Sequence, residues 1–119
     1  MPGATLFKVI FTDDAVDDLE QLYHYITRHD VDGKADDVDG KADYVLDQLE
    51  ACVAQLGQNP RRGTFPPELI TLGIRDFREI FFKPYRIIYR IISENIYIML
   101  IADGRRDMET LLQRRLLRH

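Results

Sequence analysis

FREIFFKPYRIIYRIISENIYIMLIA, residues 77–102, consists of three runs rich in β-branched and aromatic residues. The runs are residues 77–82, 85–92 and 96–102, and only Lys83-Pro84 and Ser93-Glu94-Asn95 lie between them. Runs of this kind are typical of strands, and connections this short join neighbouring antiparallel strands. The stretch therefore predicts a three-stranded antiparallel meander.

Upstream of the meander, the sequence predicts one strand and two helices. Residues 6–11 alternate like a strand, and Thr12 with the aspartates after it offers a cap for a helix. Apolar residues then recur at helical spacing in two successive segments. The first stripe is Ala15, Leu19, Leu22, Tyr23 and Ile26, and the second is Val45, Leu49, Cys52, Val53 and Leu56. Gly57 and Asn59-Pro60 are stop signals, so the helices should form an antiparallel hairpin.

Two further segments flank the meander. Residues 61–67 form a Gly/Pro-rich connection before it, and a short helix with an apolar side is expected from about Met108 to the end. The prediction is one domain, 1–119, of the α+β class. Its order is β-α-α-β-β-β with a terminal helix, and the helical hairpin packs on a small, curved, mainly antiparallel sheet.

The second face of this sheet needs a partner of its own. If the last strand alternates regularly, Ile96, Ile98, Leu100 and Ala102 share one face, and Tyr97, Met99 and Ile101 share the other. On the preceding strand, Arg86, Ile88, Arg90 and Ile92 form a mixed stripe opposite the core residues. A domain this small is expected to have too few helices to cover both faces. The mixed stripe therefore predicts a groove for a partner protein.

An exact tandem repeat lies between the two helices, because DVDGKAD occupies residues 30–36 and again 37–43. Asp and Gly are poor helix formers, so the first copy is expected to lengthen the loop rather than the helix. Asp32 and Asp39 are two candidate caps for the second helix. The Asp-x-Asp-Gly motif does not fit a calcium loop, because the glycine is fourth rather than sixth.

Composition limits the function classes. The chain has 119 residues, 45% of them apolar, a net charge of −4, and no stretch that predicts a membrane span or a signal peptide. A single cysteine, Cys52, fits a reducing compartment, so a cytoplasmic location is expected. Residues 1–60 carry 4 Lys/Arg and 13 Asp/Glu, whereas residues 61–119 carry 12 Lys/Arg and 7 Asp/Glu. The second half is therefore basic, which fits either an acidic partner or an ordinary sheet surface.

The sequence lacks the motifs of the common catalytic and metal sites. Ser93 lies in a predicted turn without a nucleophile motif, and Cys52 lies on an apolar helix stripe. The histidines His24, His29 and His119 lack metal-ligand spacing, and no phosphate-binding loop is present. No metal and no cofactor are predicted.

Several motifs are similar to those of one protein family. The runs Phe77-Arg78-Glu79-Ile80 and KPYRIIYRI, residues 83–91, resemble the sheet core of ParE-type plasmid-stabilisation toxins. DGRRDM, residues 103–108, followed by Leu111-Leu112 resembles the C-terminal signature of the same family, and Pro67-Glu68-Leu69 with Gly73 also fits. The chain thus resembles the ParE branch of the RelE/ParE toxin–antitoxin superfamily.

This resemblance implies a toxin of a type II toxin–antitoxin system. ParE-type toxins are associated with inhibition of DNA gyrase, which blocks replication, and RelE-type toxins cut mRNA on the ribosome. Two arginines and a tyrosine carry that cleavage, and here Arg86 and Arg106 occupy the arginine positions while Leu112 stands at the tyrosine position. The expectation is a gyrase inhibitor and not an enzyme. A ribosome-dependent endoribonuclease and an inactive toxin homologue are the alternatives.

The implied partners are a ParD-like antitoxin, in a toxin–antitoxin hetero-oligomer, and gyrase, without membrane or direct nucleic-acid contact. The antitoxin-binding candidates are Arg86, Ile88, Arg90 and Ile92, the mixed stripe of the sheet. The target-binding candidates are Arg105, Arg106, Arg114, Arg115 and Arg118. The alternative for the first two arginines is local pairing with Asp103 and Asp107, which would only shape the turn.

Overall fold

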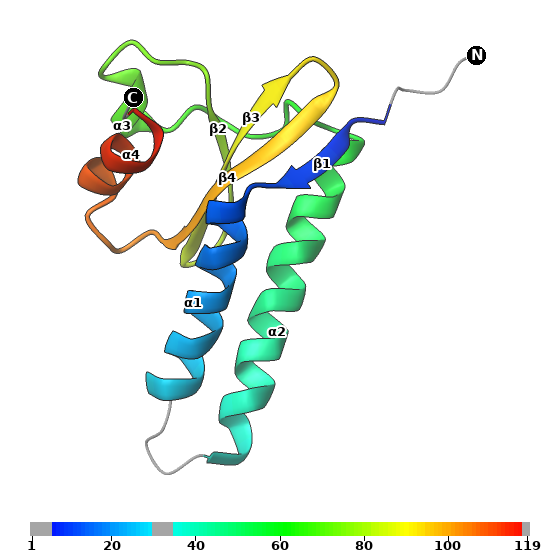
Figure 1. The fold of residues 1–119 in the computed structure, drawn as a ribbon, viewed down its shortest axis with the longest axis vertical. Coiled ribbons are helices and arrows are strands. Elements are labelled where there is room, and N and C mark those ends of the chain that lie inside the picture. The colour runs from blue at the N-terminus through cyan, green and yellow to red at the C-terminus, as the bar shows by residue number, and fades with distance from the viewer. Residues whose placement is uncertain (1–5, 30–34, 118–119) are drawn as a thin grey trace.

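The computed structural model describes residues 6–29 and 35–117. Figure 1 shows the elements in this order: β1 (Lys8–Phe11), α1 (Asp13–His29), α2 (Ala35–Ala54), a 3-10 turn η1 (Gln55–Gly57), α3 (Pro67–Ile70), β2 (Arg78–Phe82), β3 (Tyr85–Ile92), β4 (Asn95–Asp103) and α4 (Met108–Leu116). None of the helices in this part of the chain is long and apolar enough to cross a membrane.

The sheet has the order β1-β4-β3-β2, with β1 parallel to β4 and the other neighbours antiparallel. The predicted meander and the α+β class are confirmed. The short turns after β2 and β3 force neighbouring strands to run in opposite directions, whereas β1 reaches β4 only through the helical hairpin. That long connection permits the parallel pairing.

The helical hairpin packs on one face of the sheet through the predicted stripes. Thr12 begins α1 as expected: its hydroxyl accepts from the backbone N–H of Ala15 at 3.2 Å and donates to the carbonyl of Ile98 on β4 at 2.7 Å. The cap therefore also fastens the helix to the sheet. A first core forms here from apolar residues of α1, α2 and the three long strands, among them Leu49, Ile87 and Tyr89.

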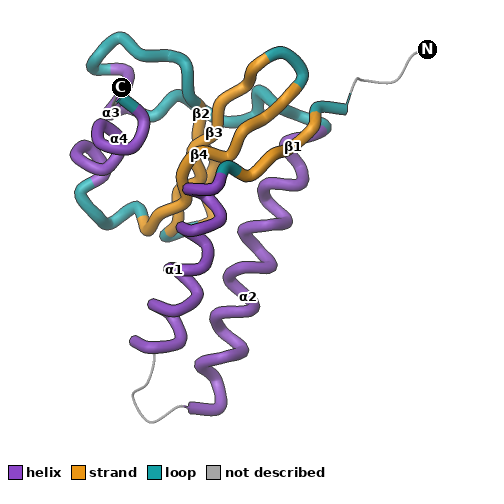
Figure 2. The backbone as a smooth tube through the Cα atoms, viewed as in Figure 1, coloured by secondary structure: helices purple, strands orange, loops and turns teal. Residues whose placement is uncertain are grey.

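A second core lies on the opposite face, which was expected to be open. The short α3 and the C-terminal α4 cover it, and Leu69, Leu111 and Leu112 pack there with Ile88 and Leu100. Figure 2 shows the helices in two groups, the long pair α1 and α2 and the smaller pair α3 and α4. The expectation of too few helices was wrong because residues 67–70 form a helix that the Gly/Pro-rich composition concealed.

An irregularity in β4 also corrects the predicted faces of that strand. Tyr89 pairs with Ile98 and Ile88 pairs with Leu100, so Met99 is an extra residue without a partner on β3. A bulge of this kind reverses the side-chain alternation that follows it. Ile101 therefore joins the first core, while Leu100 turns to the second.

The duplicated segment lies partly inside α2. This helix begins at Ala35, so the whole second copy, residues 37–43, is helical. Asp39 is therefore an interior residue and not the cap of the helix, which corrects that prediction. Residues 30–34, which include Asp32 and most of the expected loop, lie outside the described residues.

Candidate functional site

The basic turn after β4 holds the first two target-binding candidates. Arg105 is exposed, and its Nε donates to Asp103 at 2.9 Å, which holds the pKa of that carboxyl below its usual value. Arg106 is also exposed, and no described carboxylate forms an ion pair with it. Asp107 instead caps α4 by accepting from the backbone N–H of Thr110 at 3.2 Å. Local pairing thus explains Arg105, whereas Arg106 stays available.

A cleft of about 590 Å³ opens beside this turn. Gln21, Leu22 and Tyr25 of α1 form one wall. The start of β3 and the end of β4, with Arg105 and Arg106, form the other. Tyr25 is 57% exposed, so an aromatic side chain lies at the surface of the cleft. Aromatic and arginine side chains are both enriched in surfaces that bind protein.

A second hollow, of about 290 Å³, separates α1 from α4. Its walls carry opposite charges. The α1 wall holds an acidic row, Asp14, Asp17 and Asp18, and the other wall holds Arg106 of the turn before α4 with Arg114 and Arg115 of α4. The acidic row is the first turn and a half of α1, where carboxylates also favour the helix dipole. Arg106 lines both hollows and therefore joins them into one surface.

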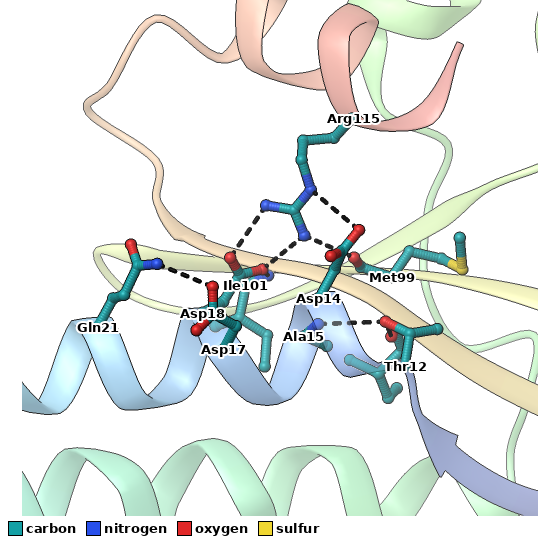
Figure 3. A network of polar contacts seen from close by, with 10 residues as sticks. Thr12, Asp14, Ala15, Asp17, Asp18, Gln21, Met99, Ile101 and Arg115 are labelled. Atoms are coloured by element: carbon teal, nitrogen blue, oxygen red, sulfur yellow. Dashed lines mark hydrogen bonds and ion pairs between the residues drawn. The ribbon is translucent and has the colours of Figure 1, made fainter. Parts of the chain in front are cut away.

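Arg115 is used to hold α4 in place. Figure 3 shows its guanidinium pointing from α4 toward α1, where NH1 and NH2 donate to the two oxygens of Asp18 at 2.9 and 3.0 Å. NH2 also donates to the carbonyl of Met99 at 3.1 Å. Asp18 in turn accepts from the backbone N–H of Ile101 at 3.0 Å. The network joins α4, α1 and the bulged part of β4.

The target-binding candidates thus differ in whether their guanidinium groups are exposed or held in ion pairs within the protein. Arg106 and Arg114 are exposed and line the same hollow, while Arg105 and Arg115 have internal ion pairs. Arg118 lies outside the described residues. As target contacts these residues stay predictions, with Arg106 and Arg114 the best placed.

The antitoxin-binding candidates also separate, because α3 and α4 cover half of the stripe. Arg86 and Ile88 are buried, at 8% and 0% exposure, so the expectation that they lie in an open groove was wrong. Arg90 is partly exposed and Ile92 is 46% exposed at the end of β3. Only this end of the stripe is open to a partner without movement of the covering helices.

Arg86 lies between two carboxylates that the sequence analysis did not single out as site residues. NH1 and NH2 each donate to one oxygen of Glu68 at 2.7 Å, and Nε donates to Glu79 at 2.8 Å. These hydrogen bonds lower the pKa of Glu68, while burial raises the pKa of Glu79 and Arg86 opposes that rise. Both carboxylates raise the pKa of Arg86, against its burial. The cluster therefore fixes α3 to the sheet as a closed network.

One signal for part of this cluster was present in the sequence. Arg86 pairs with Phe81 across the ladder, so Glu79, two residues before Phe81, is its diagonal neighbour on the same face. No comparable rule places Glu68 or joins Asp18 to Arg115, because these contacts depend on how α3 and α4 dock.

Leu112 is fully buried in the second core, at 0% exposure. Leu112, which was expected at the tyrosine position of RelE-type toxins, therefore points into the protein and not toward solvent. An apolar side chain there cannot donate or accept a proton. The position serves the packing of α4.

Comparison with known proteins places these features in a family. The sequence model of the family described as "ParE toxin of type II toxin-antitoxin system, parDE" matches residues 9–108. The chain belongs to the ParE toxin family. No curated protein matches it.

Three solved structures have a fold similar to that of this ParE-family chain. A toxin–antitoxin structure titled as the chromosomal ParDE system from P. aeruginosa has a TM-score of 0.63 at 19% identity, over 84% of this chain and 98% of that one. The RelBE2 complex from Mycobacterium tuberculosis has a TM-score of 0.52 at 19% identity, covering 83% and 92%. A mutant of E. coli toxin RelE in the free state has a TM-score of 0.57 at 13% identity, covering 89% and 92%. At identities this low, the similarity shows a shared fold.

Proposed function

We propose that this ParE-family toxin acts by binding a protein target, DNA gyrase, and blocking replication, and that it does not cleave mRNA. The observation that carries the proposal is the closed cluster around Arg86. A guanidinium that acts at a scissile phosphate must be free to bind it, whereas that of Arg86 already donates to Glu68 and Glu79. A phosphate approaching Arg86 would also meet two carboxylates.

The C-terminal position supports the same proposal. Leu112 offers no hydroxyl for acid–base chemistry and no exposed ring for stacking on a base. Of the three positions that serve cleavage in RelE-type toxins, only Arg106 is exposed and without an ion pair to a described carboxylate. One arginine gives binding but no proton transfer.

The surface around Arg106 supports a protein as the target. Arg106 and Arg114 face the acidic row of α1 across the hollow, and Tyr25 stands at the adjoining cleft. Arg115 forms ion pairs with Asp14 and Asp18 of this row, so the hollow presents charges of both signs. A protein with charges of both signs can complement such a surface, whereas a nucleic-acid backbone carries negative charge alone. Gyrase as the target places the toxin in the cytoplasm.

We also propose a ParD-like antitoxin as the partner in a hetero-oligomer, with Arg90 and Ile92 in its binding surface. Two of the similar structures are titled as toxin–antitoxin systems or complexes, which supports the pairing. A stable complex requires roughly 800 Å² buried on each partner, which involves many more residues than Arg90 and Ile92. The antitoxin must therefore extend beyond Ile92 or displace α4 to reach Ile88.

The experiment compares gyrase supercoiling with ribosome-dependent mRNA cleavage for three chains. These are the wild type, Arg106→Ala/Arg114→Ala, and the control Lys8→Ala/Arg28→Ala, which removes two exposed charges elsewhere. The wild type and control should inhibit supercoiling and leave mRNA intact. The double variant should bind gyrase at least a hundredfold more weakly, because well-made charge-assisted contacts contribute about 1.5 to 3 kcal/mol each.

Two outcomes contradict the proposal. Cleavage of mRNA by the wild type with supercoiling unaffected identifies an endoribonuclease instead. Inactivity of the folded wild type in both assays identifies an inactive homologue.

A further inference from the structure

A second basic site lies at the other end of β3 from the Arg105–Arg106 turn. It is a pocket of about 510 Å³ between the residue 61–65 loop, the start of β2 and the end of β3. Four arginines line it, Arg61, Arg75, Arg78 and Arg90, with a single carboxylate, that of Asp76. This excess of positive charge is not shared with either hollow near α4. Of its four arginines, Arg90 also belongs to the antitoxin-binding surface proposed above, whereas Arg61, Arg75 and Arg78 have no role there.

Arg78 forms a fixed cation in this pocket. Its NH1 donates to the carbonyl oxygens of Gly63 and Arg61 at 2.8 and 3.3 Å, and its guanidinium lies 4.5 Å from the centre of the Phe65 ring. These partners are neutral, so they orient the guanidinium without cancelling its charge, unlike the carboxylates around Arg86. A guanidinium has five N–H donors, so Nε and NH2 remain available for a ligand.

The other arginines are also weakly neutralised. The guanidinium of Arg75 also lies over the Phe65 ring, 5.8 Å from its centre. No described carboxylate forms an ion pair with Arg75 or Arg61. Arg90 is 3.7 Å from Asp76, a pair whose side chains are 42% and 56% exposed. An exposed pair at this distance contributes little and is readily given up to a ligand.

We propose that this pocket binds the phosphate groups of a nucleic-acid backbone. Guanidinium groups bind phosphate through paired, charge-assisted hydrogen bonds, and a hollow lined by four of them concentrates positive potential. The Phe65 ring is engaged by Arg75 and Arg78, so it holds the arginines and is not free to stack on a base. Contacts to phosphates carry no sequence information, so binding is independent of sequence.

A nucleic acid fits this pocket better than an acidic protein segment does. Protein interfaces place apolar side chains at their centre, but only Phe65 and Ile91 are apolar here. Interfaces with nucleic acid are polar and strongly positive, as this pocket is. The proposal departs from the expectation from the sequence, which was that the protein makes no direct nucleic-acid contact. It does not depend on gyrase being the target.

The test measures binding of the full chain to a fluorescein-labelled 20-base-pair DNA duplex by anisotropy, at several salt concentrations. The variant Arg61→Gln/Arg75→Gln removes two exposed charges from the pocket, and Arg28→Gln/Lys83→Gln removes two exposed charges far from it. Each lost phosphate contact reduces the slope of log K against log salt by about 0.9, so the pocket variant should lose about 1.8. At 0.1 M salt this corresponds to binding weakened about 60-fold.

The proposal is supported if the control changes affinity less than twofold, two unrelated duplex sequences bind equally, and both variants melt at the wild-type temperature. Equal binding by the pocket variant and the wild type overturns it. Inorganic phosphate that displaces the duplex at millimolar concentration identifies a free anion site instead. Polyglutamate that binds as tightly as the duplex, and is lost in the pocket variant, identifies an acidic protein segment instead.

Discussion

Replacing Arg86 by Met should destabilise the protein strongly, because the cluster around it is structural. Methionine keeps the stem that lies against Gly104 but removes the guanidinium between Glu68 and Glu79. Glu68, with 23% of its side chain exposed, can regain water, whereas Glu79, with 3%, cannot. The penalty therefore falls mainly on Glu79.

The size of this penalty follows from the protonation of Glu79. Left charged and unpaired, a buried carboxylate costs about 3 to 5 kcal/mol. Taking up a proton is the alternative, and at pH 7 this costs about 3.4 kcal/mol, because the ordinary pKa of 4.5 lies about 2.5 units lower. We therefore expect Arg86→Met to lower the free energy of unfolding by about 3 to 4 kcal/mol at pH 7. At pH 5 the protonation cost falls below about 1 kcal/mol, and the loss should shrink with it.

Urea denaturation at both pH values measures these changes. Arg90→Met is the matched control, since it removes the same group from the same strand at a partly exposed position. It should cost under about 1 kcal/mol, because the ion pair of Arg90 with Asp76 is exposed to solvent. Arg86→Met/Glu79→Gln should recover most of the loss at pH 7, because the amide carries no charge. An Arg86→Met protein as stable as the wild type but no longer toxic would refute this reasoning and return Arg86 to a role at a phosphate.

Four further results are expected. Gly40→Ala should stabilise the protein by about 1 kcal/mol in urea denaturation, since Gly40 lies inside α2 and an added Cβ meets nothing within 4 Å; a loss of stability would show that α2 begins later. The pKa of Glu68 is lowered in the folded protein, so the charged carboxylate stabilises the fold above pH 4.5, and this stabilisation is lost as the pH falls through the native pKa. Glu68→Gln should therefore flatten the acid side of the plot of melting temperature against pH. An unchanged acid side would contradict the pairing of Glu68 with Arg86. Arg115→Met should cost about 2 to 4 kcal/mol and speed hydrogen exchange in α4, because it leaves Asp18 unpaired; slow exchange would show that apolar packing alone holds the helix. Deleting residues 30–36 gives the same chain as deleting the second copy of the repeat, and it should change stability by less than about 1 kcal/mol, because the apolar stripe from Ala42 onward is kept. A loss of several kcal/mol would show that the deleted copy is packed against the rest of the protein.

Local patterns in the sequence determined most of the architecture. The spacing of apolar residues fixed which faces of α1 and α2 are buried, because helix geometry alone relates residues three and four positions apart. The short turns in residues 77–102 fixed the meander for a similar reason, since they permit only antiparallel neighbours. The same residues, with the DGRRDM run, sufficed for the family.

The candidate sites depended on contacts between segments far apart in the chain, which no local pattern encodes. The bulge at Met99 turned Leu100 to the second face, and α3 and α4 then covered that face. These long-range contacts decided whether an arginine is structural or available. Arg86 meets the carboxylate of Glu68, 18 residues away, and Arg115 meets Asp18, 97 residues away. Among the described residues, Arg78 meets only neutral carbonyls and an aromatic ring. The sequence specifies that a guanidinium is present, but its free charge depends on the groups that the tertiary structure brings within hydrogen-bonding distance.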